Sequence, residues 1–234
     1  MNNPVKFISG RLIKRYKRFF ADVKLDSGEV VTAHCPNTGS MMGLLTEGNI
    51  VYLSKTDNEK RKLKYTLEII RDKGASVGVN THRANRIVEK AIIEKKISTL
   101  GKKYDFRREV KYGKNSRIDF LITNKKDEEI FLEVKNVTLS MRKGVAEFPD
   151  AITERGSKHL LELIDVVKKN KRAIMLFLVQ RDDCKKFRIA EEIDSIYKKN
   201  IMNAMKAGVE ILCYGCSFVR NNIELDKKIK FIDK

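Results

Sequence analysis

Long apolar runs are absent from this sequence, and it contains no internal repeat and no low-complexity segment. A helix needs about 20 apolar residues to cross a bilayer, and no stretch of the chain approaches that length. The first residues also lack the apolar centre of a secretory signal peptide. We therefore expect no membrane-spanning segment and a cytoplasmic location.

Cysteine is scarce, with four residues at the scattered positions Cys35, Cys184, Cys213 and Cys216. The one spacing that resembles a metal or redox motif is Cys213-x-x-Cys216, but no second pair completes a zinc site. This pair falls in a segment that resembles a late strand, where thiols act as small apolar side chains. We expect buried thiols rather than a zinc or redox centre.

Acidic residues are too few to balance the basic ones, and the formal net charge is +18. The excess occurs on both sides of residue 78, so it does not belong to a detachable tail. The electrostatic field of such a positive charge attracts polyanions, which favours a nucleic-acid partner over an anionic membrane. A high charged fraction also marks proteins adapted to heat, and only the sign of the imbalance favours nucleic acid.

Two segments of alternating apolar and polar residues, 117–122 and 130–135, flank a short polar stretch. This pattern predicts a β-hairpin. With the turn at the centre of the polar stretch, Asp119 lies opposite or diagonal to Glu133, and Glu133 and Lys135 point to the same face. Two carboxylates and one ammonium group then converge on one patch.

Such a patch suits Mg²⁺, which binds through one or two carboxylates and keeps part of its hydration. A lysine beside the metal can orient a water or neutralise charge that builds on a phosphate. The alternative is an ordinary solvated strand face. However, Asp119 lies inside an apolar strand, and an acid in that position needs a structural or functional reason.

Short segments of alternating basic and apolar residues occupy the start of the chain, with a turn at Asp26-Ser27-Gly28. They lie at 5–10, 11–20, 21–25, 29–34, 43–54 and 64–71. About five short strands in some seventy residues predict a small closed β-barrel. The OB-fold is the leading candidate, over residues 1–78.

Basic and aromatic residues interleave in this barrel, the mixture with which single-strand-binding surfaces track phosphates and stack bases. The predicted nucleic-acid contacts are Arg11, Lys14, Arg15, Tyr16, Lys17 and Arg18, beside Phe19 and Phe20. The alternative is that the phenylalanines alternate into and out of the barrel while the basic residues face water.

A turn-rich loop follows at 35–41. Asn37 and Thr38 belong to a cluster of donors in this loop that could meet a phosphate or an adjoining domain. Pro36 and Gly39 could equally serve only to shape the turn.

The periodicity changes near residue 79, which predicts a second domain over 79–234. Asn80 or Thr81 can cap its first helix. The predicted order is a helix through Ile92, a strand at 104–112, the hairpin, a helix around 160–167, a buried central strand at 173–180, a helix at 193–207, a buried strand at 209–214 and a lysine-rich tail. The second domain is therefore an α/β layer.

Lys158 and His159 stand near the start of the second helix, where the helix dipole favours anions. A bound phosphate would remove this conflict. We therefore predict phosphate contacts from Arg155, Lys158 and His159. The alternative for His159 is a histidine at the surface or at the edge of the core.

Asp119, thirteen intervening residues and then Glu133-Val134-Lys135 resemble the core motif of PD-(D/E)XK restriction endonucleases. A wider set of motifs is similar to the sugar fermentation stimulation protein A family. They are CPNTGSM at 35–41, VGVNT at 77–81, SRIDF at 116–120, EVKNVT at 133–138 and FPDAITERGSKHL at 148–160. The resemblance implies a mixed α+β chain, with an OB-fold barrel, a restriction-endonuclease-like α/β domain and DNA as partner.

The resemblance also implies roles for individual residues. It makes Asp119 and Glu133 ligands of Mg²⁺ or Mn²⁺, with the Val134 carbonyl as a third ligand, and Lys135 the catalytic lysine. Ile118 stands where the nuclease pattern has a proline, at a position that varies among these nucleases.

Nuclease cores of this kind often add an acid from the first helix. Glu89 is the candidate for this role, as a further metal ligand, and Glu109 on the next strand is its substitute.

We predict a DNA-binding protein of the sugar fermentation stimulation family with a Mg²⁺-dependent phosphodiesterase site. The alternative is a non-catalytic DNA-binding regulator of sugar-utilisation genes, with the nuclease fold as a scaffold. A protein–protein adaptor fits the charge poorly. The sequence allows a homo-oligomer but does not indicate one.

Overall fold

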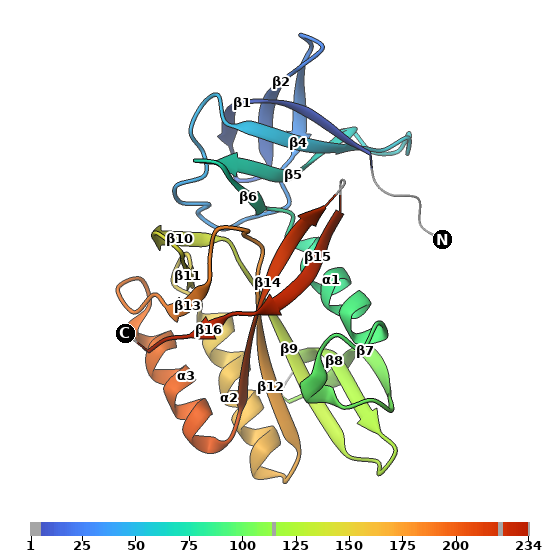
Figure 1. Cartoon of the computed structure of the whole chain (residues 1–234), viewed down its shortest axis with the longest axis vertical. Coiled ribbons are helices and arrows are strands. Elements are labelled where there is room, and N and C mark those ends of the chain that lie inside the picture. Colours follow the sequence, from blue (N-terminus) through green and yellow to red (C-terminus); the bar gives the residue numbers. More distant parts are fainter. Residues whose placement is uncertain (1–5, 114–115, 220–221, 234) are drawn as a thin grey trace.

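The computed structural model describes residues 6–113, 116–219 and 222–233. A β-barrel built from the first part of the chain lies above a larger α/β domain, as Figure 1 shows. The predicted start of the first strand at Val5 lies outside the described residues.

Five strands close the barrel. They are β1 (Phe7–Tyr16), β2 (Phe20–Leu25), β3 (Val30–His34), β4 (Ile50–Lys55) and β5 (Tyr65–Asp72). Their order is β3-β2-β1-β4-β5, and a parallel pairing of β3 with β5 closes the ring. A short sixth strand, β6 (Ala75–Gly78), pairs with β5 outside the ring. The predicted OB-type barrel is confirmed in its strand number and closure.

The first strand differs from the expected pattern. One strand, β1, runs through Gly10 and Arg11, where two segments were predicted. It ends in a turn at which Lys17 and Arg18 have positive φ values of 47° and 61°. A Cβ atom on Gly10 would lie 2.6 Å from the Lys24 carbonyl oxygen, so glycine permits the close approach of β1 to β2 at this point.

A mixed six-stranded sheet forms the centre of the α/β domain, in the order β15-β14-β12-β9-β8-β7. Its strands are β7 (Tyr104–Tyr112), β8 (Ser116–Asn124), β9 (Glu129–Val137), β12 (Arg172–Val179), β14 (Glu210–Val219) and β15 (Asn222–Lys228). β7, β8 and β9 form an antiparallel meander, whereas β9, β12 and β14 are parallel. The meander and the central strand β12 confirm the predicted order.

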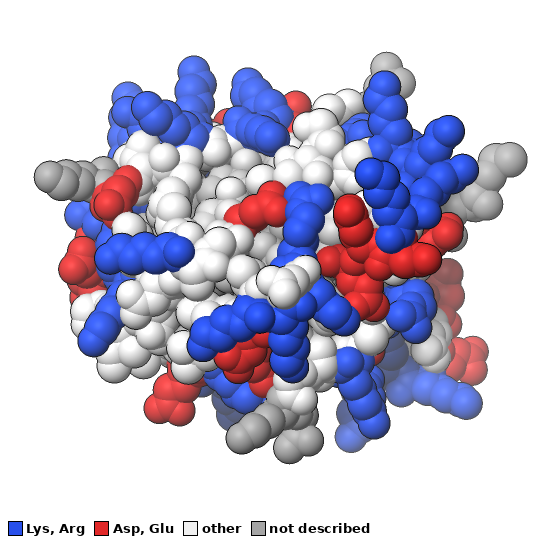
Figure 2. All heavy atoms as spheres, turned by 90° about the horizontal axis from the view of Figure 1, so that it is seen from below, with Lys and Arg blue, Asp and Glu red and all other residues white. Residues whose placement is uncertain are grey.

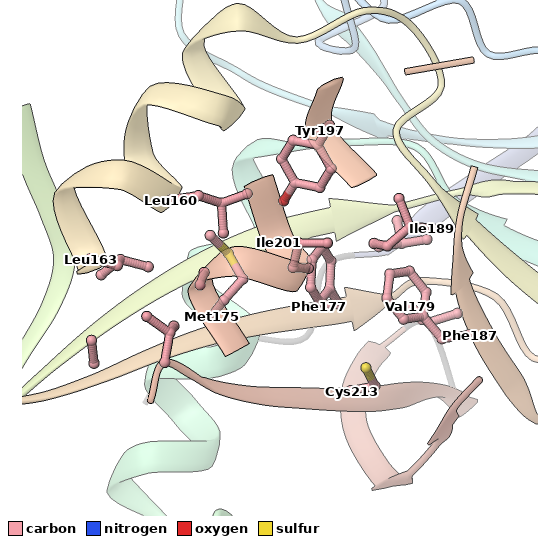
Figure 3. Packing of buried hydrophobic residues seen from close by; sticks show 14 of the residues in the cluster. Leu160, Leu163, Met175, Phe177, Val179, Phe187, Ile189, Tyr197, Ile201 and Cys213 are labelled. Carbon is pink, nitrogen blue, oxygen red and sulfur yellow. The ribbon is translucent and has the colours of Figure 1, made fainter. Parts of the chain in front are cut away.

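Helices cover both faces of this sheet. They are α1 (His82–Ile93), α2 (Glu154–Lys168) and α3 (Ser195–Ala207), with a short 3₁₀ helix, η1 (Ser98–Leu100), after α1. α1 packs with Ile174 and Leu176 of β12 on one face, and α2 and α3 pack with Met175 and Phe177 on the other. Figure 3 shows the second of these cores. β12 is therefore buried on both faces, as its continuous apolar sequence predicts.

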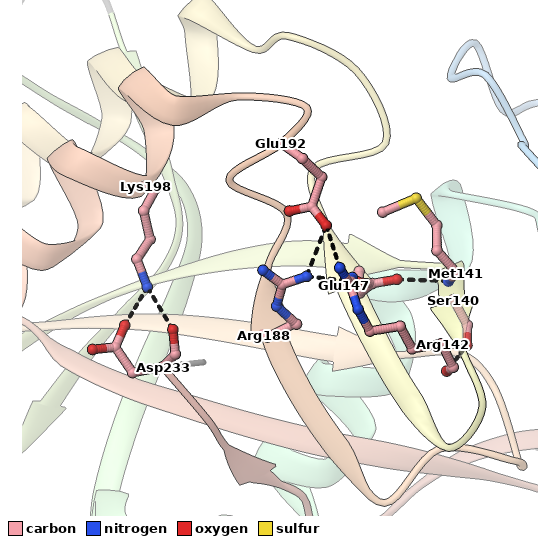
Figure 4. A network of polar contacts seen from close by, with 8 residues as sticks. All are labelled: Ser140, Met141, Arg142, Glu147, Arg188, Glu192, Lys198 and Asp233. Carbon is pink, nitrogen blue, oxygen red and sulfur yellow. Dashed lines mark hydrogen bonds and ion pairs between the residues drawn. The ribbon is translucent and has the colours of Figure 1, made fainter.

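A second, four-stranded sheet was not predicted. Its strands are β10 (Leu139–Arg142), β11 (Val145–Phe148), β13 (Lys186–Ile189) and β16 (Lys230–Phe231). A buried Glu147 on β11 is held there by Arg142 and Arg188, which also contact Glu192 (Figure 4). The expected lysine-rich tail is corrected as well, because β15 and β16 extend both sheets.

All four cysteines are free and buried, which confirms that prediction. Lysine and arginine side chains spread over the lower face of the molecule, and acidic side chains occur among them (Figure 2). The net charge of +18 is therefore not gathered into one acid-free patch on this face.

Phe177 tests the packing of the larger core. Its fully buried ring contacts the rings of Phe148 and Phe187. We expect Phe177→Ala to lower the free energy of unfolding by about 3–5 kcal/mol, because it leaves a cavity. Ile196→Ala truncates an exposed side chain and should change the free energy of unfolding by no more than about 0.5 kcal/mol. Urea unfolding of both variants measures the difference. Equal losses in the two variants would contradict this packing.

Candidate active site

The β8–β9 hairpin carries the predicted acids. Phe120 pairs with Leu132, and Leu121 with Phe131, in the register that the polar turn predicts. Asp119 and Glu133 are the next residues on the two strands beyond the pair of Phe120 and Leu132. Both side chains line the same cleft.

Asp119 is fixed by two hydrogen bonds. The Nδ2 atom of Asn85 on α1 donates to Oδ1 over 2.7 Å, and the backbone N–H of Val134 donates to Oδ2 over 2.7 Å. α1 is itself anchored near its start, where Asn80 Oδ1 accepts from the His82 N–H. The helix therefore orients the carboxylate on the neighbouring sheet.

Glu133 lies deeper, with 3% of its surface exposed. Its Oε1 atom accepts from Lys135 Nζ over 2.7 Å and also contacts His159 Nδ1 in a short hydrogen bond. Its Oε2 atom is buried and has no hydrogen-bond partner among the described residues. A buried acceptor without a partner is costly, which makes this atom a candidate ligand for a cation.

The two carboxyl groups have opposite pKa shifts. Burial and the nearby Glu133 raise the pKa of Asp119 from 3.8 to about 6, despite its hydrogen bonds with Val134 and Asn85. Burial alone would raise the pKa of Glu133, but His159 and Lys135 hold it below its ordinary value. A cation bound between the two groups would favour the ionised form of Asp119.

The residues of this cleft can supply a few oxygen ligands to a hard cation. Asp119 and Glu133 supply carboxylate oxygens, and Val134 lines the same cleft. No group of three His, Cys, Asp or Glu side chains with metal-site geometry occurs in the described part of the chain. Two carboxylates are a donor set that a hard divalent cation can use, with waters as its remaining ligands.

Basic groups surround the acids. The cleft has a volume of about 430 Å³, and a neighbouring hollow of about 410 Å³ shares both carboxylates with it. The basic side chains that line the two are His82, Arg108, Arg117, Lys135, Arg155, Lys158 and His159. This arrangement can hold a phosphate group beside a carboxylate-bound cation.

The acid expected from α1 lies elsewhere. Glu89 forms an ion pair with Arg108 over 2.8 Å and is not among the residues that line the cleft. α1 instead contributes Asn85, one helical turn earlier. Glu109, the substitute candidate, does line the cleft, and it has a positive φ of 52° at a break in the β7–β8 pairing.

The three residues predicted at the start of α2 lie in different environments. Arg155 is exposed, and its Nε atom lies 3.5 Å from His159 Nε2. Lys158 is half-exposed and pairs with Glu162 over 3.8 Å. His159 is buried against Glu133 rather than at the surface.

The predicted barrel residues lie outside the cleft. Arg11 donates to the Gly48 carbonyl, and Lys14 approaches Asp22 to 3.9 Å. Lys17 and Arg18 are exposed in the β1–β2 turn, and Tyr16 stacks on Phe20 with ring centres 5.4 Å apart. Arg15 is committed to the backbone, because its Nη2 atom donates to the carbonyls of Arg18, Asn37 and Gly39.

The loop at 35–41 meets the second domain. Ser40 Oγ donates to the Asp150 carbonyl, and Thr81 Oγ1 donates to the Pro36 carbonyl. Asn37 is buried and accepts from the Gly39 N–H, whereas Thr38 is exposed. Of the two predicted partners for this loop, the structure therefore shows the adjoining domain.

Asn136, which belongs to the motif at 133–138, and Gln180 form a contact that the sequence does not predict. Asn136 lines both the cleft and a cavity between the domains, and its Oδ1 atom accepts from Gln180 Nε2 over 2.5 Å. The backbone carbonyl of Gln180 in turn accepts from the Gly78 N–H of the barrel sheet. Nothing in the local sequence of either residue indicates this connection.

In the described residues, no helix has both the length and the apolar character needed to span a membrane.

Comparisons with known proteins match most of the chain. Residues 13–79 match the SfsA N-terminal OB domain, and residues 82–222 match the Sugar fermentation stimulation protein RE domain. A sugar fermentation stimulation protein homolog from Pelagibacter ubique is 54% identical and covers 97% of both chains. A homolog from Maricaulis maris is 50% identical and covers 92% of both.

A solved structure is similar over nearly its full length. The structure of Pyrococcus furiosus SfsA in complex with Ca²⁺ has a TM-score of 0.88 and 26% identity, and the match covers 97% of this chain and 96% of that chain. The predicted fold class, an OB-fold barrel followed by a restriction-endonuclease-like α/β domain, is confirmed.

The raised pKa of Asp119 predicts a pH-dependent stability. The folded protein binds this proton more tightly than the unfolded chain, so ionisation destabilises the fold as pH rises from about 4 to 6. Asp119→Asn cannot ionise, and its stability relative to wild type should rise by up to about 3 kcal/mol across this window and then level off.

Urea unfolding at a series of pH values in EDTA measures this difference. The exposed Asp165 provides the control, since Asp165→Asn should give a nearly flat profile. A flat profile for Asp119→Asn would contradict the raised pKa.

Proposed function

The chain belongs to the sugar fermentation stimulation protein family, and we propose that it is a DNA-binding phosphodiesterase that uses a divalent cation. The observation that carries the proposal is the buried Oε2 atom of Glu133, which has no partner in the described residues and faces no competing hydrogen bond. In this proposal residues 1–78 bind nucleic acid and residues 79–234 carry a PD-(D/E)XK site.

Asp119 and Glu133, with the Val134 carbonyl, would hold Mg²⁺ or Mn²⁺. The Pyrococcus furiosus relative is in complex with Ca²⁺, another hard cation that takes oxygen ligands, which supports a divalent site. Such a cation supplies Lewis-acid activation of a phosphate oxygen and lowers the pKa of a bound water.

Lys135 would act on the phosphate and on the attacking water. Its Nζ atom donates to Glu133 Oε1 and lies 3.3 Å from His159 Nδ1. An ammonium group has three donors, so one bond to Glu133 leaves others for a water or for a phosphate oxygen that gains charge. His159 would orient Glu133, and Arg155 and Lys158 would contact phosphates next to the scissile one.

The charge distribution supports DNA as the substrate. A net charge of +18 steers a polyanion towards the protein, and the barrel adds exposed Lys14, Lys17 and Arg18. Since DNA is the proposed substrate, we also propose a cytoplasmic location.

One observation favours a non-catalytic regulator as the second candidate. Lys135 already forms an ion pair with Glu133 and His159 forms a hydrogen bond with it, so the fold does not need a cation to tolerate this buried charge. In a regulator of this kind, the cluster would serve only to tie α2 to β9.

A cleavage assay separates the two candidates. Wild-type protein with Mg²⁺ or Mn²⁺ should cut DNA, and Lys135→Ala should slow cleavage by at least about 100-fold because the developing charge loses its stabilising partner. Lys126→Ala, in the exposed β8–β9 turn, is the matched control and should cut like wild type. DNA binding without cleavage under either metal would favour the regulator.

Metal binding can be measured without cleavage. A divalent cation at about 100 times its dissociation constant should stabilise the wild type by about 2.7 kcal/mol in thermal unfolding. Glu133→Gln should lose this stabilisation, because an amide binds a hard cation more weakly than a carboxylate. Glu89→Gln should keep it, since Glu89 is paired with Arg108; its loss in that variant would instead make Glu89 a ligand.

A further inference from the structure

The active-site cleft continues towards the barrel. The cleft that contains Asp119 and Glu133 shares Thr81 and Asn136 with a cavity of about 230 Å³ between the two domains. The barrel loop lines the opposite side of this cavity with Asn37, Thr38 and Gly39. A linear polymer bound at Asp119 and Glu133 can therefore extend into the cavity between the domains.

Close packing between the domains fixes that side of the cavity. A Cβ atom at position 39 would lie 2.4 Å from a carboxylate oxygen of Asp150, so glycine at this position permits the present close approach. Arg15 Nη2 holds the loop from behind, at 2.7 Å from the Asn37 carbonyl and 3.0 Å from the Gly39 carbonyl. The exposed Thr38 is thus presented on a rigid support.

The same support continues into the β1–β2 turn. Arg15 also donates to the Arg18 carbonyl, and the Cys35 N–H donates to the Phe19 carbonyl over 2.7 Å. The turn that carries Lys17, Arg18 and Phe19 is therefore joined to the loop that lines the cavity.

Phe19 has the properties of a stacking platform. Its side chain is 47% exposed, and it makes no ring contact with another aromatic residue in the described part of the chain. Lys17 and Arg18 beside it are exposed as well. An exposed ring flanked by cations is how proteins bind the bases and phosphates of a single strand.

We propose that the substrate is a single nucleic-acid strand that runs from the acids, past Thr38, to a base stacked on Phe19. This inference rests on the proposed function in one respect, which is that a phosphate of the strand binds at Asp119 and Glu133. Bases of a duplex are already stacked on one another, so they cannot use Phe19 unless the helix is opened at a cost.

The acids in the cavity determine which part of the strand lies there. Glu147 forms ion pairs with Arg142 and Arg188. Asp150 is the other acidic residue that lines the cavity, and it would repel a phosphate. A sugar or a base edge faces Asp150 in this arrangement, and the phosphate on that nucleotide points towards Thr38 and Asn136.

Fluorescence anisotropy with labelled oligo-dT of about 12 nucleotides tests the path, in EDTA and at fixed salt. The single strand should bind more tightly than a duplex of equal length. Phe19→Ala should weaken binding of the single strand by at least about fivefold, and Phe19→Tyr should restore it. Val30→Ala removes another exposed apolar side chain of the barrel and should have no effect.

A length series locates Phe19 along the strand. In competition by oligo-dT of increasing length, the loss of affinity caused by Phe19→Ala should grow with length, because only a longer strand contacts the acids and the turn together. Tighter binding of the duplex would overturn the inference, as would equal affinities of Phe19→Ala and Val30→Ala for the long strand. Since no step requires cleavage, failure of the proposed phosphodiesterase activity would be seen separately.

Discussion

The buried carboxylate of Glu133 is the constraint on which the site depends. An ionised group with 3% exposure is tolerated only with close partners, and Lys135 and His159 supply them. His159 belongs to α2, so the same contact fixes the helix against β9. The start of α2, with Arg155 and Lys158, is thereby placed beside the cleft.

Contacts between the domains depend on a second set of polar groups. Gly39 allows the barrel loop to reach Asp150, and Ser40 and Thr81 bond across the boundary. Gln180 joins the barrel sheet to Asn136 at the edge of the cleft. The barrel is therefore attached to the site itself, and its loop forms part of the surface that a bound molecule meets.

The sequence predicts those parts of the fold that follow from local pattern. Alternation and a polar turn define the β8–β9 hairpin, and its register places Asp119 and Glu133 in one cleft. The short strands β10, β11, β13 and β16 carry too few residues for a clear period, so the second sheet was missed.

Contacts over long sequence distances were not predictable in the same way. His159 lies 26 residues from Glu133, and only the packing of α2 on the sheet brings them together. Arg15 resembles a phosphate contact in sequence, yet the fold uses its guanidinium for three backbone carbonyls. Glu89 and Asn85 share one face of α1, and helix placement alone decides that Asn85 reaches Asp119.

The opposite pKa shifts of the two acids suggest how the site can serve a cation and a substrate in turn. Glu133 is ionised by its partners before any cation binds, so it offers a preformed charge. The pKa of Asp119 is raised to about 6, so this carboxyl group is partly protonated near that pH, and a bound cation would displace the proton. In the proposed function, a cation held by Glu133 would share the neutralisation of this carboxylate, and Lys135, which uses one of its three donors on Glu133, would keep the others for a phosphate oxygen. The ion pair seen between Lys135 and Glu133 is thus compatible with a reactive lysine, because both states satisfy the buried carboxylate.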